Sequence, residues 1–120
     1  MLKRIVFSFS RAWQGLKTGW CREYSLKVFA LIAGLVVIGI LVLHTSRLES
    51  AILILTISVM FSLELLNSQI ERFLNLVSPQ KSQLVKEIKD LSAGAVLVVA
   101  MGAVIIGFLI FLPHLVALLR

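Results

Sequence analysis

Residues 93–112 read AGAVLVVAMGAVIIGFLIFL, a run of 20 residues without a charged or hydrogen-bonding side chain. About 20 apolar residues in helical conformation are enough to cross the hydrocarbon core of a bilayer. Two apolar stretches precede this one, and helical periodicity favours helices for all three. We therefore predict membrane spans at about residues 26–44, 51–70 and 91–112. Pro113 is expected to end or kink the last helix.

The composition indicates an integral membrane protein. Of the 120 residues, 59% are hydrophobic and 15% are charged, and the mean hydropathy is +1.01. Soluble domains average about 45–50% apolar and about 25% charged residues. The chain is too short for two domains, so we expect one all-α membrane domain over residues 1–120. The single Cys21 excludes an internal disulfide.

The N-terminal segment, residues 2–24, has the pattern of an amphipathic helix that lies on the membrane surface. Apolar residues, tryptophan among them, occupy one face, which suits the headgroup level of a bilayer. Most of the polar residues lie on the other face: Lys3, Arg4, Arg11, Gln14, Lys17 and Thr18. A cleavable signal peptide is disfavoured, because the apolar stretch starts late and lacks a small-residue cleavage site.

The basic residues predict the orientation of the chain. Six of the twelve Lys and Arg residues precede the first span and four lie between positions 72 and 89. The positive-inside rule then places the N-terminus and the second connection in the cytoplasm. The net charge of +6 does not form a dense patch, so we expect anionic headgroups or nucleotide phosphates as partners, and not nucleic acid.

Five polar residues share one face of the predicted third helix, and we call them the polar stripe. At about 100° per residue their spacing places them within an arc roughly 100° wide. A carboxylate at bilayer depth costs at least ~2.5 kcal/mol on insertion scales, which makes an ionisable residue there a candidate functional group. The stripe consists of Glu64, Asn67, Ser68, Glu71 and Asn75.

Further charged residues are expected at the same cytoplasmic level: Glu23, Lys86, Lys89 and Asp90. Carboxylates together with lysines suit a magnesium-assisted reaction of phosphate groups. In such a reaction the acids hold the metal and lysine neutralises phosphate charge. A further carboxylate can accept the proton of an attacking hydroxyl. The sequence contains no GxxxxGK[ST] phosphate loop, which argues against the soluble NTPase design.

Two motifs resemble those of the small bacterial integral-membrane lipid kinases, the family of prokaryotic diacylglycerol kinase and undecaprenol kinase. The first is Glu64-Leu-Leu-Asn-Ser-Gln-Ile-Glu71, and Lys89-Asp90 follows some 17 residues later, ahead of a small-residue span. The similarity extends over about residues 4–113. It implies a homotrimer of three-span subunits, with active sites at subunit boundaries and MgATP entering from the cytosol.

The resemblance also implies roles for individual residues. Glu64 would be the base that activates the lipid hydroxyl, and Glu23 and Glu71 would bind Mg²⁺ together with the nucleotide phosphates. The γ-phosphoryl group would pass directly to the primary hydroxyl, without a phosphoenzyme. The remaining residues of the nucleotide site would be Arg4, Asn67, Lys89 and Asp90.

Several positions depart from the family pattern. Asn75 stands where the family usually has Asp, and Val28-Phe29 replaces a polar or acidic pair. Lys81-Ser82 replaces a common Tyr-His, which affects the expected adenine and ribose contacts. Ala93-Gly94 is more similar to the undecaprenol kinase branch.

Three candidate functions remain, and the first two are those that the resemblance implies. The leading one is an ATP-dependent kinase of the bacterial inner membrane that converts diacylglycerol to phosphatidate. The second is the same chemistry on undecaprenol, giving undecaprenyl phosphate. The third is a non-enzymatic adaptor or small exporter, in which Glu64 is a buried acid paired with a neighbouring helix and Asn67 and Ser68 join helices by hydrogen bonds.

Overall fold

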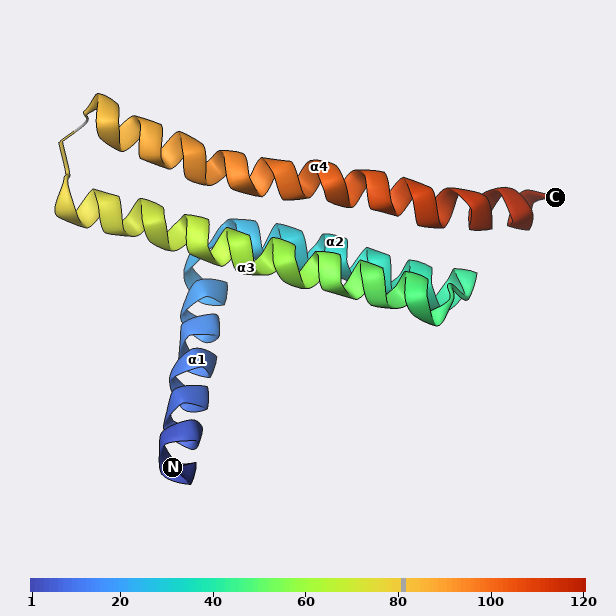
Figure 1. The fold of residues 1–120 in the computed structure, drawn as a ribbon, viewed down its shortest axis with the longest axis horizontal. Coiled ribbons are helices and arrows are strands. Elements are labelled where there is room, and N and C mark those ends of the chain that lie inside the picture. Colours follow the sequence, from blue (N-terminus) through green and yellow to red (C-terminus); the bar gives the residue numbers. More distant parts are fainter. Residues whose placement is uncertain (81) are drawn as a thin grey trace.

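The computed structural model describes residues 1–80 and 82–120, and this part of the chain forms four α-helices (Figure 1). Lys81, one of the positions that depart from the family pattern, lies outside the described residues. In order, the helices are α1 (Leu2–Arg22), α2 (Tyr24–Leu43), α3 (Arg47–Val77) and α4 (Gln83–Leu119). The prediction of an all-helical chain is confirmed.

A single residue with extended backbone, Glu23, interrupts the helical conformation between α1 and α2. Glu23 has extended backbone angles, φ −105° and ψ 110°, and its N–H donates to the carbonyl of Gly19. This break lets α1 leave the other helices sideways, as Figure 1 shows. Gly19 allows the end of α1 to pack closely against α2 and α3, since a Cβ at this position would lie 3.0 Å from Leu65 Cδ2 and 3.2 Å from Leu26 Cδ1.

Helix α3 begins at Arg47, four residues earlier than the predicted span. Its start is a capping box, in which the Ser46 hydroxyl accepts from the Glu49 N–H at 3.1 Å and Glu49 Oε1 accepts from the Ser46 N–H at 2.9 Å. The connection between the first two predicted spans is therefore shorter than their bounds indicate, and His44 lies in the left-handed region at φ 53°.

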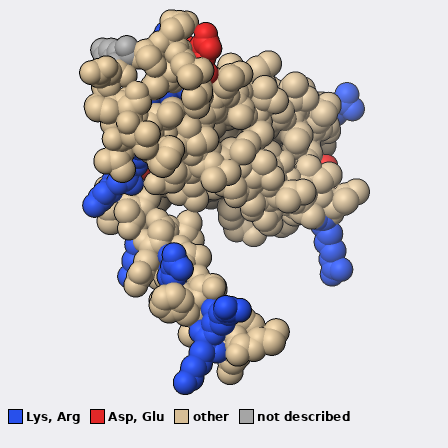
Figure 2. All heavy atoms as spheres, turned by 60° about the vertical axis from the view of Figure 1, so that its left-hand side comes forward, with Lys and Arg blue, Asp and Glu red and all other residues tan. Residues whose placement is uncertain are grey.

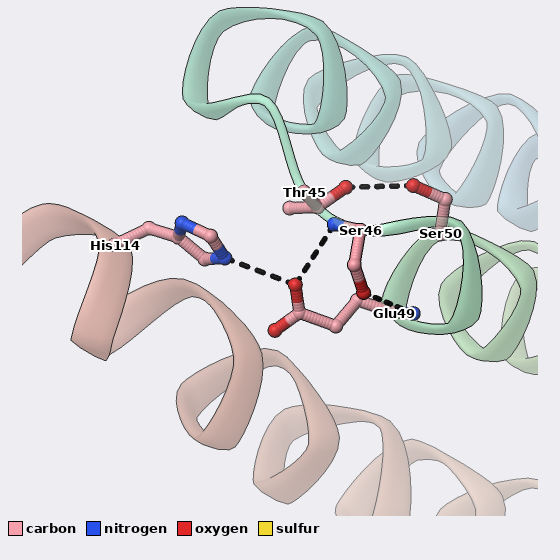
Figure 3. Close-up of polar contacts among 5 residues, drawn as sticks. All are labelled: Thr45, Ser46, Glu49, Ser50 and His114. Carbon is pink, nitrogen blue, oxygen red and sulfur yellow. Dashed lines mark hydrogen bonds and ion pairs between the residues drawn. The ribbon is translucent and has the colours of Figure 1, made fainter.

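The same end of the molecule carries a contact between α3 and α4 (Figure 3). His114 Nε2 donates to Glu49 Oε1 at 3.1 Å, so that one carboxylate both caps α3 and binds α4. Thr45 and Ser50 are joined by a hydrogen bond between their hydroxyls, 2.7 Å long. The His114 contact fastens the C-terminal part of α4 to the start of α3, and the Thr45–Ser50 bond joins the preceding turn to α3.

Helix α4 runs antiparallel to α3, and these two helices make the most extensive contact in the described chain (Figure 1). Helix α4 does not end at Pro113 but continues to Leu119. Proline removes one backbone hydrogen bond, and neighbouring helices allow membrane helices to tolerate this loss. The alternative that Pro113 ends the helix is therefore wrong.

Helices α2, α3 and α4 are long and apolar enough to cross a membrane, with mean hydropathies of 2.8, 1.8 and 3.0 over their best windows. Most of their large apolar side chains are exposed, and the buried ones are Leu26, Leu53 and Ile110. Figure 2 shows this surface as largely uncharged, with Lys and Arg side chains spread along α1. The structure thus contains three long apolar helices that are candidate membrane spans, the number that the sequence predicts.

Candidate active site

Glu64 is the charged residue that the helices bury most deeply among those described. Its side chain, on α3, is 8% exposed, and Oε1 accepts a hydrogen bond of 2.6 Å from the Ser25 hydroxyl in the first turn of α2. Burying a charged group is costly unless it is hydrogen-bonded or paired. Ser25 supplies such a bond, and the sequence analysis did not select it. The available signal was a hydroxyl two residues after Glu23, at the start of an apolar segment.

The middle of the polar stripe contains an acceptor without a donor. Ser68 is 4% exposed, whereas Asn67 is half-buried and its buried Oδ1 has no hydrogen-bond partner in the described part of the chain. Leaving a buried acceptor unpaired costs about 1–3 kcal/mol. Such an atom in a native fold calls for an explanation, for example an ion, a water or a bound group.

The far end of the polar stripe faces the first turns of α4. Lys89 Nζ donates to Asn75 Oδ1 at 2.7 Å, so Asn75 keeps a link to Lys89 although it lacks the charge of Asp. Glu71 is exposed on α3. Lys86 and Asp90 lie 3.6 Å apart with exposed fractions of 70% and 66%. A pair that exposed adds at most about 1 kcal/mol, so both side chains remain available to other partners.

Glu23 and Arg4, both predicted for the nucleotide site, lie at opposite ends of α1. Glu23 is partly exposed in the connection before α2, two residues from the serine that contacts Glu64. Arg4 lies near the free end of α1, 18 residues before Arg22, or about 27 Å along the helix at 1.5 Å per residue. Figure 1 shows this end projecting away from α3 and α4, so the fold of one chain does not bring Arg4 to the polar stripe.

Two surface hollows lie beside these residues. An apolar pocket of about 450 Å³ is formed where α1 meets α2 and α3, and its lining includes Trp13, Leu16, Trp20, Leu26, Phe61 and Leu65. Leu26 and Leu65 directly follow Ser25 and Glu64 in the chain, although Ser25 and Glu64 themselves do not line the pocket. A second hollow of about 420 Å³ on the first turns of α4 is more polar and includes Lys86, Lys89 and Asp90.

The donor set can be compared with the needs of Mg²⁺. No group of three or more His, Cys, Asp or Glu residues able to hold a metal occurs within residues 1–80 and 82–120. Mg²⁺ in phosphoryl-transfer sites usually takes one or two carboxylates together with substrate phosphates. Glu71, Glu23 and Asn67 Oδ1, which has no hydrogen-bond partner in the described chain, are oxygen atoms of the kind that Mg²⁺ binds.

Long apolar helices, a buried acid on α3 and two lysines on the first turns of α4 are features of a helical membrane protein. The chain belongs to the prokaryotic diacylglycerol kinase family, whose family model matches residues 10–111. The resemblance found in the sequence is confirmed, and the chain is a member of a family of membrane lipid kinases.

Individual relatives cover nearly the whole chain. It is 40% identical to an undecaprenol kinase of Bacillus subtilis, over 95% of this chain and 93% of the relative. It is 33% identical to a diacylglycerol kinase of Synechocystis, over 96% of this chain and 66% of the relative. A diacylglycerol kinase of Escherichia coli is 25% identical over 92% of this chain and 91% of its own length.

Proposed function

We propose that the protein transfers the γ-phosphoryl group of MgATP to the primary hydroxyl of a lipid alcohol at the cytoplasmic face of the bacterial inner membrane. The observation that carries this proposal is Glu64, a buried acid on α3 whose chain neighbour Leu65 lines an apolar pocket. A lipid chain in the pocket would bring its hydroxyl to the carboxylate, which would accept the proton as the phosphoryl group is attacked.

The nucleotide would bind at the end of the molecule where α3 faces α4. Glu71 and Glu23 would hold Mg²⁺, which when bound with ATP neutralises charge on the phosphates. Lys89 would give its positive charge to the phosphates, with Asp90 beside it and the free Oδ1 of Asn67 accepting a further contact. Arg4, near the free end of α1, would reach the nucleotide of a neighbouring subunit.

The assembly that we propose is a homotrimer of one-domain subunits, each formed by residues 1–120. Its support is the large exposed apolar surface of α2, α3 and α4, together with the distance between Arg4 and the polar stripe of its own chain. Helix α1 would lie in the membrane interface with the N-terminus in the cytoplasm, because its basic residues would meet anionic headgroups.

For the acceptor, we propose undecaprenol ahead of diacylglycerol. The identity to the Bacillus subtilis undecaprenol kinase is 40%, against 33% and 25% for the two diacylglycerol kinases. The Ala93-Gly94 pair points the same way. Diacylglycerol remains the second candidate, because the matching family is described as prokaryotic diacylglycerol kinase.

The test is a phosphate-transfer assay with purified protein in mixed micelles that contain either undecaprenol or diacylglycerol. We expect magnesium-dependent transfer from ATP, faster to undecaprenol, and its loss in Glu64→Gln with assembly unchanged on size exclusion. Glu87→Gln is the matched control, since Glu87 is an exposed acid on α4, and it should retain wild-type turnover. Turnover by Glu64→Gln would remove the base assignment, and no transfer to either lipid by the wild type would favour an adaptor or exporter.

A further inference from the structure

Ser25 makes a contact unlike those of the hydroxyl residues within the spans. Thr56, Ser58 and Ser62 each donate to the carbonyl four residues earlier in their own helix, at 2.7–2.9 Å. Ser25 instead donates across to α3, to a carboxylate 39 residues away. It follows the extended Glu23 and stands in the first turn of α2, where no earlier turn of that helix offers a carbonyl.

The contact is short and buried. Its 2.6 Å length lies in the range of O–H···O⁻ bonds, which are about twice as strong as neutral ones. Ser25 is partly buried and Glu64 is 8% exposed, so water competes little for the bond. Within residues 1–80 and 82–120 the hydrogen bond from Ser25 is the one that the Glu64 carboxylate accepts, and it is made to Oε1.

We propose that Ser25 is a positioning residue for Glu64, which rests on the proposed role of Glu64 as the base for the lipid hydroxyl. By donating to Oε1, the serine hydroxyl orients the carboxylate. Oε2 can then accept a hydrogen bond, and in the reaction the proton, from the hydroxyl of the lipid. Leu26 and Leu65, which directly follow the two bonded residues in the chain, line the apolar pocket in which we propose that the lipid chain lies. A displacement of about 1 Å at a reacting group can cost on the order of 100-fold in rate.

The discriminating experiment uses substitutions of similar shape. Ser25→Thr keeps a hydroxyl. Ser25→Val places a side chain of nearly the same shape as threonine at this position, but without a hydroxyl. In the micelle assay we expect Ser25→Val and Ser25→Ala to lower kcat by roughly 10-fold to 100-fold. The KM for MgATP should stay within about 2-fold, because the hydroxyl acts on the carboxylate and not on the nucleotide. Ser25→Thr should recover most of kcat.

Ser62→Ala is the control for loss of a hydroxyl in this region, since Ser62 lies on α3 two residues before Glu64 and bonds only its own helix among the described residues. It should retain the wild-type kcat. Thermal melting in micelles of the Val and Thr variants shows whether the two fold equally well.

The outcomes separate this inference from the proposed function. Equal kcat for Ser25→Val and Ser25→Thr, with equal melting, overturns the positioning role even if Glu64→Gln is inactive. A loss that appears in the KM for MgATP also overturns it. If the wild type transfers no phosphate to either lipid, the proposed function fails and the inference fails with it.

Discussion

Lys86 and Lys89 on α4 have different surroundings although they are only three positions apart. Lys89 is half-buried and donates to Asn75 on α3, whereas Lys86 is largely exposed and faces only Asp90 within its own helix. The contact with Asn75 fixes the direction of the Lys89 ammonium group toward the polar stripe. Under the proposed function, this contact would make Lys89, and not Lys86, the lysine that acts at a bound phosphate.

We predict that Lys89→Met raises the KM for MgATP by at least about 10-fold, because a charge-assisted hydrogen bond to phosphate contributes about 1.5–3 kcal/mol. Lys86→Met is the matched control and should change that KM by less than about 2-fold, since exposed pairs contribute little. The measurement is initial-rate kinetics with MgATP varied at saturating lipid. A larger effect at Lys86 would exchange their roles.

At the scale of the helices, the contact between α1 and the spans depends on Gly19. Leu65 and Leu26 lie 3.0 Å and 3.2 Å from the position of a Cβ at residue 19. Gly15, one turn earlier on the same helix, has nothing within 4 Å of that position. One glycine is thus required for close approach and the other is not.

We predict that Gly19→Val displaces α1, because a β-branched side chain would overlap both leucines, and overpacking typically costs about 1–3 kcal/mol. Trypsin should then cleave at Lys17 and Arg22 faster in micelles, and turnover should fall because the apolar pocket loses its α1 wall. Gly15→Val should leave both readouts as in the wild type. Equal cleavage of the two variants would contradict the importance of the Gly19 contact.

The helices also show what local sequence patterns can and cannot predict. Hydropathy and helical period predicted three long apolar helices. The polar stripe identified Glu64 as a candidate functional group. The S-x-x-E spacing of Ser46 and Glu49 was present in the sequence and would have set the start of α3 correctly. The bond between Ser25 and Glu64 was not predictable in this way, because it depends on the packing of α2 against α3.

At the scale of the whole molecule, one chain leaves its proposed site incomplete. The candidate residues on α3 and α4 gather toward one end of the molecule, while Arg4 lies near the free end of α1 (Figure 1). The spans also expose most of their large apolar side chains. Association of identical chains around a symmetry axis would cover part of this surface and could bring α1 of one subunit to α3 of another.

A subunit-mixing experiment tests this arrangement. If Arg4 and Glu64 of one site come from different chains, Arg4→Ala and Glu64→Gln subunits, each nearly inactive alone, should regain activity when co-expressed. With random mixing at equal amounts, the chance that a site has both residues intact is about one quarter, so we expect about one quarter of wild-type turnover. Co-expression of Glu64→Gln with Glu71→Gln, two substitutions on one helix, is the comparison. No recovery in the Arg4 and Glu64 mixture would mean that each chain supplies both residues to its own site, and α1 would then have to fold back toward α3.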